Sequence, residues 1–174
     1  MPVSTVNHPV CLRDCECVMR NHFILPVFSS PMPLTPDHQQ EILALLDRYA
    51  QCYTKKSLEG ILSLSSPGIS GFGSGPDEIV PDFTRFREQI RRDLAQADAV
   101  SVSFDVLKLD GQMPFAWISA FSTFDVRIKE ERITLHGRMT ALFRNTGSRW
   151  LFEQVHFSLP YEGQQRGASY PGSS

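Results

Sequence analysis

The first strong hydrophobic pattern in the chain has the period of an α-helix. Thr35 and Pro36 form a helix start, because a threonine hydroxyl can cap the first turn and proline at the first helical position has no N–H to leave unpaired. Apolar residues then recur at helical spacing: Ile42, Leu45, Leu46, Tyr49, Cys52 and Tyr53. This stripe predicts an amphipathic helix that ends near residue 54.

Two shorter helices are predicted downstream. Ser57 is a suitable cap for the first of them, whose apolar side consists of Leu58, Ile61 and Leu62. The second starts near Pro81 and Asp82, and its apolar side consists of Phe83, Phe86, Ile90 and Leu94. The glycine-rich run of residues 68–75 between them cannot be helical, so it is predicted to form a short strand and a loop.

From Ala99 onward the hydrophobic period changes to that of β-strands. Apolar residues alternate with polar ones from Val100 to Val106, and Asp110-Gly111 predicts a turn after this strand. Three more strands are predicted, over residues 114–129, 132–144 and 149–159. Helices followed by hairpin-connected strands predict an α+β fold, with three helices packed on one face of an antiparallel sheet. Strands of this length must twist and bend, so the strongly bent sheet and the helices would form a hollow cone.

Composition and charge restrict the classes of partner. The chain has 174 residues, a net charge of −2 and 41% hydrophobic residues, which is ordinary for one globular domain. The basic cluster within residues 85–92 is interspersed with acidic side chains, which argues against nucleic-acid binding. No apolar run reaches the roughly 18 residues of a membrane span, and the N-terminus lacks the apolar segment of a secretory signal. We therefore expect a cytoplasmic protein without a nucleic-acid or membrane partner.

The two ends of the chain lack a sustained pattern. Residues 1–34 are predicted to be a flexible leader and residues 161–174 a flexible tail, which leaves residues 35–160 as the domain. The leader contains side chains with the chemistry of zinc ligands: Cys11, Cys15, Cys17 and His22. Their spacing lacks the paired C-x2-C pattern of structural zinc modules, so we expect reduced thiols and no bound metal.

Four stretches of sequence carry a resemblance to a known family. They are residues 46–49 with 57–61, Ala116-Trp117, residues 137–140, and Trp150 followed by residues 156–160. Over about residues 35–160 the chain resembles the SnoaL-like branch of the NTF2-like (cystatin-like) superfamily, which includes ketosteroid isomerases, polyketide cyclases and the association domain of calmodulin-dependent kinase II. The resemblance implies a pocket in the cone for a small hydrophobic or aromatic oxygenated ligand, chemistry without a cofactor, and a homodimer formed through the outer face of the sheet.

The resemblance also provides candidate catalytic positions. Tyr49 matches a tyrosine that donates to the substrate oxyanion in ketosteroid isomerases, although as part of the apolar stripe it is more simply pocket-lining core. Tyr53, one turn further on, is a ligand-binding candidate. The carboxylate base of those enzymes corresponds to a position near Gly73, and their acidic second donor falls near Thr140. Because neither residue is acidic, ketosteroid isomerisation is not expected.

Further candidates depend on which way alternate strand residues face. If Thr140 faces inward, so do His136 and Arg138. A four-residue turn before the last strand would then pair Thr140 with Glu153, directing Glu153 inward and His156 outward. A three-residue turn would reverse the last strand, and the sequence leaves both arrangements open.

Each of these candidates has a chemical role. Arg138 could pair with Glu153 or meet a ligand carboxylate or phenolate, because its planar guanidinium matches such anions. The candidates for a proton-transfer base are Glu153, His136, His156 and Asp125. The candidates for ligand binding are Tyr53, Trp117, Arg138 and Thr140.

Two functions compete at this stage. In the first, a pocket binds a small molecule and assists isomerisation, cyclisation or hydration by proton transfer. In the second, the protein is a non-catalytic dimeric assembly module. Both faces of the strand around Trp117 are apolar and a single copy would expose one of them, so a homodimer is expected in either case.

Overall fold

The protein's structure, a computed structural model, describes residues 32–172. The helices are α1 (Pro36–Thr54), α2 (Leu58–Ser63) and α3 (Phe83–Gln96). The strands are β1 (Ser65–Phe72), β2 (Ile79–Val80), β3 (Ala99–Gln112), β4 (Phe115–Ile128), β5 (Glu131–Asn145) and β6 (Trp150–Ser158). None of these helices combines the length and apolar composition needed to cross a membrane. The zinc alternative, on Cys11, Cys15, Cys17 and His22, lies outside the described residues.

The three predicted helices are confirmed, and so are their caps. The Thr35 hydroxyl accepts a hydrogen bond from the His38 N–H at 3.2 Å, and the His38 ring accepts one from the Thr35 N–H at 3.3 Å. Ser57 and Asp82 cap α2 and α3 by accepting from a backbone N–H three residues further along. Five residues of α1 are buried on one side: Ile42, Leu45, Leu46, Tyr49 and Tyr53.

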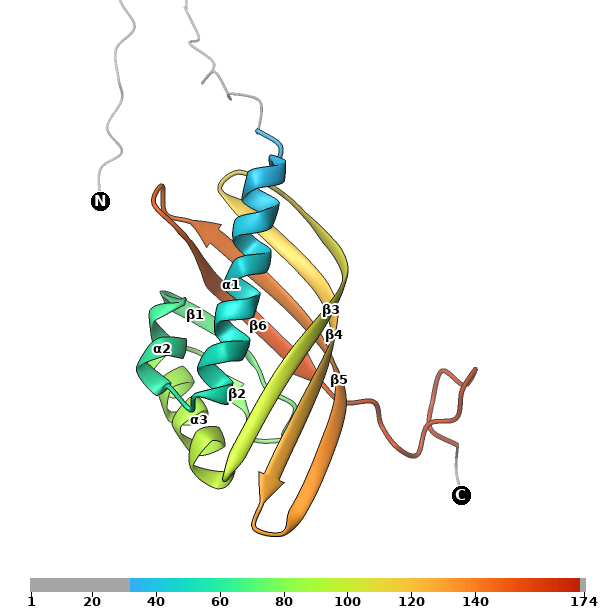
Figure 1. Cartoon of the computed structure of the whole chain (residues 1–174). Coiled ribbons are helices and arrows are strands. Elements are labelled where there is room, and N and C mark those ends of the chain that lie inside the picture. The colour runs from blue at the N-terminus through green and yellow to red at the C-terminus, as the bar shows by residue number, and fades with distance from the viewer. Residues whose placement is uncertain (1–31, 173–174) are drawn as a thin grey trace, which may run out of the picture. The chain divides into compact units, whose positions relative to one another are not determined.

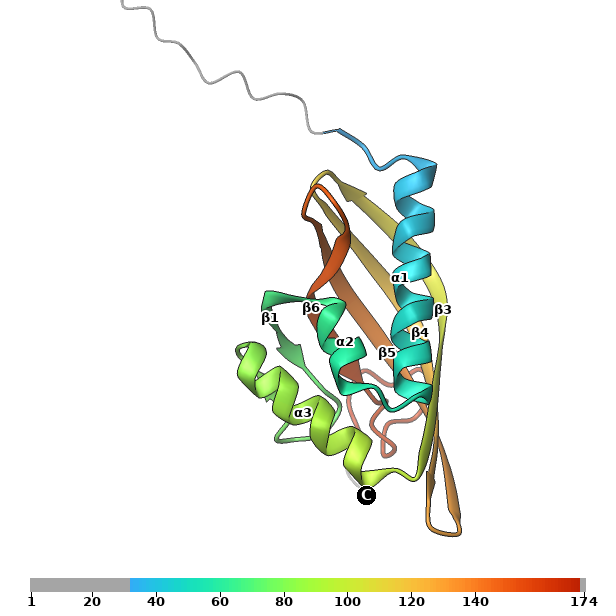
Figure 2. The same cartoon turned by 60° about the vertical axis from the view of Figure 1, so that its left-hand side comes forward.

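The strands form one six-stranded sheet in the order β2-β1-β6-β5-β4-β3. The neighbours from β3 to β6 pair antiparallel, as predicted, whereas β1 pairs parallel to β6. All three helices lie on the same side of the sheet, with α1 along the long strands (Figure 1) and α3 beside β1 (Figure 2). The fold is therefore α+β, and its sheet is mixed because the glycine-rich strand joins it in parallel.

The hairpin between β3 and β4 differs from the prediction of a turn at Asp110-Gly111. Both residues stay in β3, which continues to Gln112. A Cβ atom on Gly111 would lie 2.5 Å from the Phe115 carbonyl oxygen. A glycine is therefore needed here, where the two strands approach closely. Pro33, at the end of the predicted leader, forms a bridge to Gln112.

The inward face of β5 is the opposite of the one first considered. Its inward residues are Gly137, Met139, Ala141 and Phe143, which are all buried. His136, Arg138 and Thr140 are exposed on the other face. The expectation that these three side chains face the interior is therefore wrong. The small and apolar residues lie on the side that the helices cover, because burying them does not remove a polar side chain from water.

The pairing of β5 with β6 differs from the first of the two arrangements that the sequence left open. Thr140 pairs with His156 and not with Glu153. The register shifts between Leu142 and Phe143, which makes Glu153 an extra residue on β6. His156 faces outward, as the first arrangement has it, but Glu153 does not line the interior. The turn has four residues, 146–149, but it lies one residue further along the chain than a pairing of Thr140 with Glu153 requires. This moves the register by two residues, and the bulge moves it by one more.

Candidate functional site

A cavity of about 280 Å³ lies between the helices and the sheet. Apolar side chains provide most of its lining: Val80, Phe86, Ile90, Val100, Phe124, Val126, Ile128, Ile133, Leu135, Val155 and Phe157. The larger polar side chains that reach it are Tyr49, Tyr53, Glu78, Gln89, Asp93 and Gln96. An apolar cavity with a few converging polar groups is typical of sites for small organic molecules.

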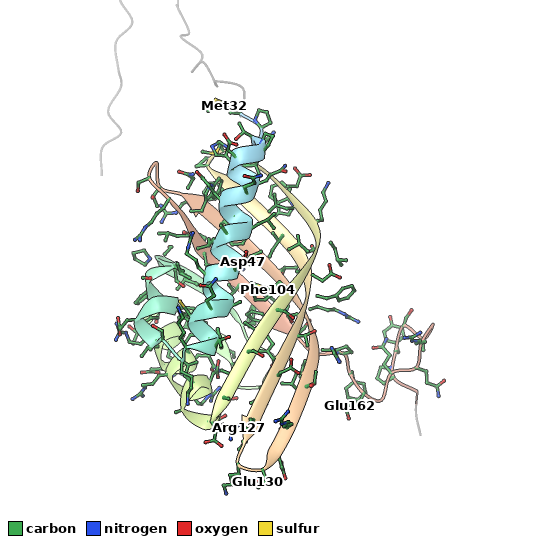
Figure 3. The ribbon with its side chains drawn as sticks, viewed as in Figure 1. Met32, Asp47, Phe104, Arg127, Glu130 and Glu162 are labelled. Atoms are coloured by element: carbon green, nitrogen blue, oxygen red, sulfur yellow. The ribbon has the colours of Figure 1, made fainter. Side chains whose placement is uncertain are left out.

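Two tyrosines on successive turns of α1 contribute hydroxyl groups to this cavity. Tyr49 is 1% exposed and Tyr53 5% exposed, and their ring centroids lie 5.1 Å apart. On its other side the Tyr49 ring contacts Phe104 of β3, which lies beside α1 in Figure 3. Within the described residues the Tyr49 hydroxyl meets no partner at hydrogen-bond geometry, although Tyr53 is near enough to influence its pKa. The Tyr49 hydroxyl is therefore a buried donor in the wall of the cavity.

Burial determines the protonation of both phenols. Removal from water disfavours the charged phenolate, so the pKa of Tyr49 and that of Tyr53 are raised well above the usual value. The negative charge on Asp93 raises both pKa values further. Both side chains are therefore neutral hydrogen-bond donors at physiological pH.

Asp93 of α3 is a lining carboxyl group whose pKa is shifted toward neutral pH. The Gln89 amide nitrogen donates to Asp93 Oδ1 at 2.7 Å. Burial, followed by the neighbouring charge of Glu78, raises the Asp93 pKa to about 6, while the Gln89 hydrogen bond and Arg92 lower it. A carboxyl group with such a pKa can both accept and donate a proton near neutral pH.

A network of side chains behind Asp93 holds this carboxyl group in place. The Gln89 amide nitrogen also donates to Glu78 Oε1 at 3.0 Å, so one amide joins the two carboxyl groups. Arg92 donates to the amide oxygen of Gln89 at 2.7 Å and to Asp77 at 2.5 Å. Because Arg92 occupies the amide oxygen, the Gln89 NH₂ group faces the carboxylates.

The acidic half of this site is not among the predicted site residues. Glu78 lies in a loop, and Gln89 and Asp93 lie on the helix whose mixed charges argued only against nucleic-acid binding. A signal was nevertheless present, because Asp93 follows the buried residues Phe86 and Ile90 at helical spacing. An acidic residue on the apolar side of an amphipathic helix is costly to bury and is a candidate functional group.

Among the predicted site residues, only Tyr49 and Tyr53 line the cavity. Five others lie on the outer face of the sheet: Trp117, His136, Arg138, Thr140 and His156. The Trp117 side chain is 45% exposed, and the His156 ring lies 5.8 Å from that of Phe72. The expectation that Trp117, Arg138 and Thr140 contact a ligand inside the cone is therefore wrong, because they lie on the strand face away from the helices.

The remaining predicted bases have structural partners. Glu153 accepts a hydrogen bond from Arg144 Nε at 2.8 Å, so the alternative in which it pairs with Arg138 is wrong. Asp125 accepts one from the Thr134 hydroxyl at 2.7 Å. Neither carboxyl group lines the cavity.

Solved structures with the same fold are similar to most of this chain. A Streptomyces avermitilis protein provisionally named a dehydratase of the NTF2-like family matches with a TM-score of 0.66 and 14% identity, over 73% of this chain and 99% of that one. A Novosphingobium aromaticivorans protein provisionally named a scytalone dehydratase matches with a TM-score of 0.65 and 12% identity, over 79% and 95%. A Xanthomonas campestris protein provisionally named a calcium/calmodulin-dependent protein kinase II association domain matches with a TM-score of 0.62 and 16% identity, over 76% and 96%.

These identities are low, so the structural matches establish the fold and not an activity. No curated protein sequence matches the chain significantly. A family model does match: that of the SnoaL-like domain, over residues 42–162, which includes every element from the middle of α1 to the end of β6. The chain therefore belongs to the SnoaL-like domain family.

Proposed function

We propose that the cavity binds a small, largely apolar molecule bearing an oxygen atom, and that the protein transfers a proton to or from this molecule without a cofactor. The observation that carries the proposal is the position of Asp93, a carboxyl group with a pKa of about 6 in an apolar cavity that also holds two buried phenols. The reaction class would be isomerisation, cyclisation, or the addition or loss of water.

Each polar group has a role in this proposal. Asp93, in its ionised form, accepts a proton from carbon or oxygen of the ligand and returns it later in the reaction. The unpartnered Tyr49 hydroxyl donates to the ligand oxygen as negative charge develops there, and this bond is strong because the cavity excludes most water. Gln89 keeps the Asp93 carboxyl group oriented.

This arrangement differs from that of the ketosteroid isomerases that the sequence resembles. The base of those enzymes corresponds to a glycine-rich stretch here, whereas Asp93 lies on α3. Two of the structural relatives bear provisional dehydratase names, which agree with proton-transfer chemistry but at 14% and 12% identity add only context. The proposal therefore depends on the cavity itself.

Hydrogen–deuterium exchange tests the proposal without the natural substrate. The full chain is incubated in D₂O with 2-tetralone, a bicyclic ketone, and loss of the proton next to the carbonyl is followed by NMR. We expect exchange above the buffer rate, reduced about a hundredfold by Asp93→Asn and at least about tenfold by Tyr49→Phe. Glu59→Gln, which removes an exposed carboxylate on α2, is the matched control and should not change the rate.

Two results would contradict the proposal. One is exchange no faster than in buffer, which would mean that the cavity does not activate a carbonyl compound. The other is an equal rate in Asp93→Asn and in the unmodified protein, which would place the base elsewhere.

We also propose, as a second function, that the protein assembles as a homodimer through the outer face of the sheet. Phe115, Trp117 and Phe121 are 41%, 45% and 49% exposed on this face of β4. Exposed aromatic side chains in a row are typical of an interface. The similarity to a protein provisionally named an association domain supports the same proposal.

A reducing compartment such as the cytoplasm would suit the free thiol of Cys52.

A further inference from the structure

The charges that line the cavity are all of one sign. Its lining contains the carboxyl groups of Glu78 and Asp93 and, among the described residues, no lysine, arginine or histidine. Arg138, the predicted partner of a ligand anion, is exposed on the outer face of the sheet. A ligand that carries a carboxylate or phosphate would therefore meet two like charges, while Arg92, which pairs with Glu78 and Asp77, does not line the cavity.

Arg92 is close enough to lower the Asp93 pKa, but among the described residues no cation forms an ion pair with Asp93. Gln89 is uncharged and bonds only Asp93 Oδ1, and in the described part of the chain no hydrogen bond reaches Oδ2. The nearest cation, Arg92, is already bonded to Asp77 at 2.5 Å and lies 3.5 Å from Glu78. A partly buried carboxylate without a counter-charge is unfavourable, and a cationic ligand would supply that counter-charge.

Aromatic rings continue around the cavity from the tyrosine pair. The Tyr53 and Phe124 centroids lie 5.8 Å apart and those of Phe124 and Phe157 lie 5.6 Å apart, and all three residues line the cavity. The faces of such rings attract cations.

We infer that the ligand of this cavity is a hydrophobic molecule that carries a protonated amine, held between Asp93, Glu78 and the aromatic rings. The inference depends on the proposed function, since it specifies the class of molecule that the same site takes. The amine pairs with the carboxylates, the hydrocarbon body occupies the apolar lining, and anionic molecules of the same shape are excluded.

Three probes with one skeleton and different charges test this inference. They are 2-aminotetralin, which is protonated at pH 7, the neutral ketone 2-tetralone, and tetralin-2-carboxylate. Isothermal titration calorimetry on the full chain measures the three dissociation constants. We expect the amine to bind at least about tenfold more tightly than the ketone and the carboxylate to bind most weakly.

Substitutions identify the carboxylates as the source of this preference. Asp93→Asn should weaken binding of the amine about tenfold and leave that of the ketone within about twofold, because it removes the charge and keeps the shape. Glu78→Gln should act in the same direction, and Glu59→Gln should change neither value. Circular dichroism melting of each variant establishes that it is folded.

The outcomes separate this inference from the proposed function. Binding of the ketone as tightly as the amine would overturn the inference and leave the proposed function standing. Tightest binding by the carboxylate, or an amine affinity unchanged in both Asp93→Asn and Glu78→Gln, would also overturn it. Binding of none of the three probes would contradict both.

Discussion

At the scale of single residues, Asp93 is a position where chemistry and stability oppose each other. Its pKa is raised from 3.8 to about 6, chiefly by burial, so the folded protein holds this proton more tightly than the unfolded chain does. The residue therefore favours folding most below pH 3.8, and this contribution is lost as the pH rises through about 6. At neutral pH the folded protein must retain an unfavourable charge, which is a cost typical of functional sites.

Asp93→Asn should accordingly stabilise the protein at high pH. The shift in pKa corresponds to about 3 kcal/mol of unfolding free energy at pH 8, and the amide can still accept the Gln89 hydrogen bond. Urea unfolding at pH 8 and at pH 4 measures the effect, and we expect the difference from the unmodified protein to disappear at the lower pH. An equal loss of stability at both values would show that Asp93 is a structural residue.

At the scale of elements, α3 carries both the core and the site. Phe86, Ile90 and Leu94 are buried on its apolar side. Gln89, Arg92 and Asp93, from the same turns of the helix, form the hydrogen-bond network. Backbone geometry at i, i+3 and i+4 brings these side chains together on one helix, so the network forms whenever the helix docks. The sequence is sufficient to predict such an element, because its cap and its period are local features.

Removing Arg92 should change the acid–base behaviour of Asp93 from outside the cavity. Arg92→Met removes a nearby positive charge and releases the amide of Gln89, and both effects raise the Asp93 pKa. The midpoint of the Asp93 carboxyl titration in ¹³C NMR measures this shift. Arg91→Met, on the same helix and exposed, is the matched control. Equal midpoints in the two variants would contradict the positioning role of Arg92.

The strands were predictable as elements but not in their register. The alternation from Val100 to Val106 is a local pattern, and the corresponding strand β3 is present. Which face of β5 is buried depends instead on where the helices dock, and the pairing of Thr140 depends on the bulge at Glu153. The predicted site residues on β4 and β5 were misplaced because the sequence does not determine which face of these strands the helices cover.

At the scale of the whole molecule, the site combines residues from distant parts of the chain. Tyr49 lies on the first helix, Glu78 in a loop, Asp93 on the third helix and Phe157 on the last strand. No local pattern links such positions, so only Tyr49, which a family resemblance pointed to, and Tyr53, one turn further on the same helix, were predicted. The acidic group became recognisable once α3 was placed against the sheet.

The proposed dimer is a prediction at this same scale. Trp117→Glu combined with Phe121→Glu would place two charges on the exposed aromatic face of β4. We expect light scattering after gel filtration to give twice the monomer mass for the unmodified protein and the monomer mass for the double variant. Leu43→Glu, at a 42% exposed position on α1, is the control and should leave the dimer intact. A monomer mass for the unmodified protein would contradict the proposed interface.

The central claim is that the cavity contains an acid–base group, and the most direct test is the titration of Asp93 in the unmodified full chain. Carboxyl ¹³C resonances are recorded as a function of pH, and Asp93→Asn assigns the signal by its disappearance. The account predicts a midpoint near pH 6, because burial and Glu78 disfavour the charged form. A midpoint near the ordinary 3.8 would contradict it, since the carboxyl group would then be solvated and unsuited to proton transfer at neutral pH.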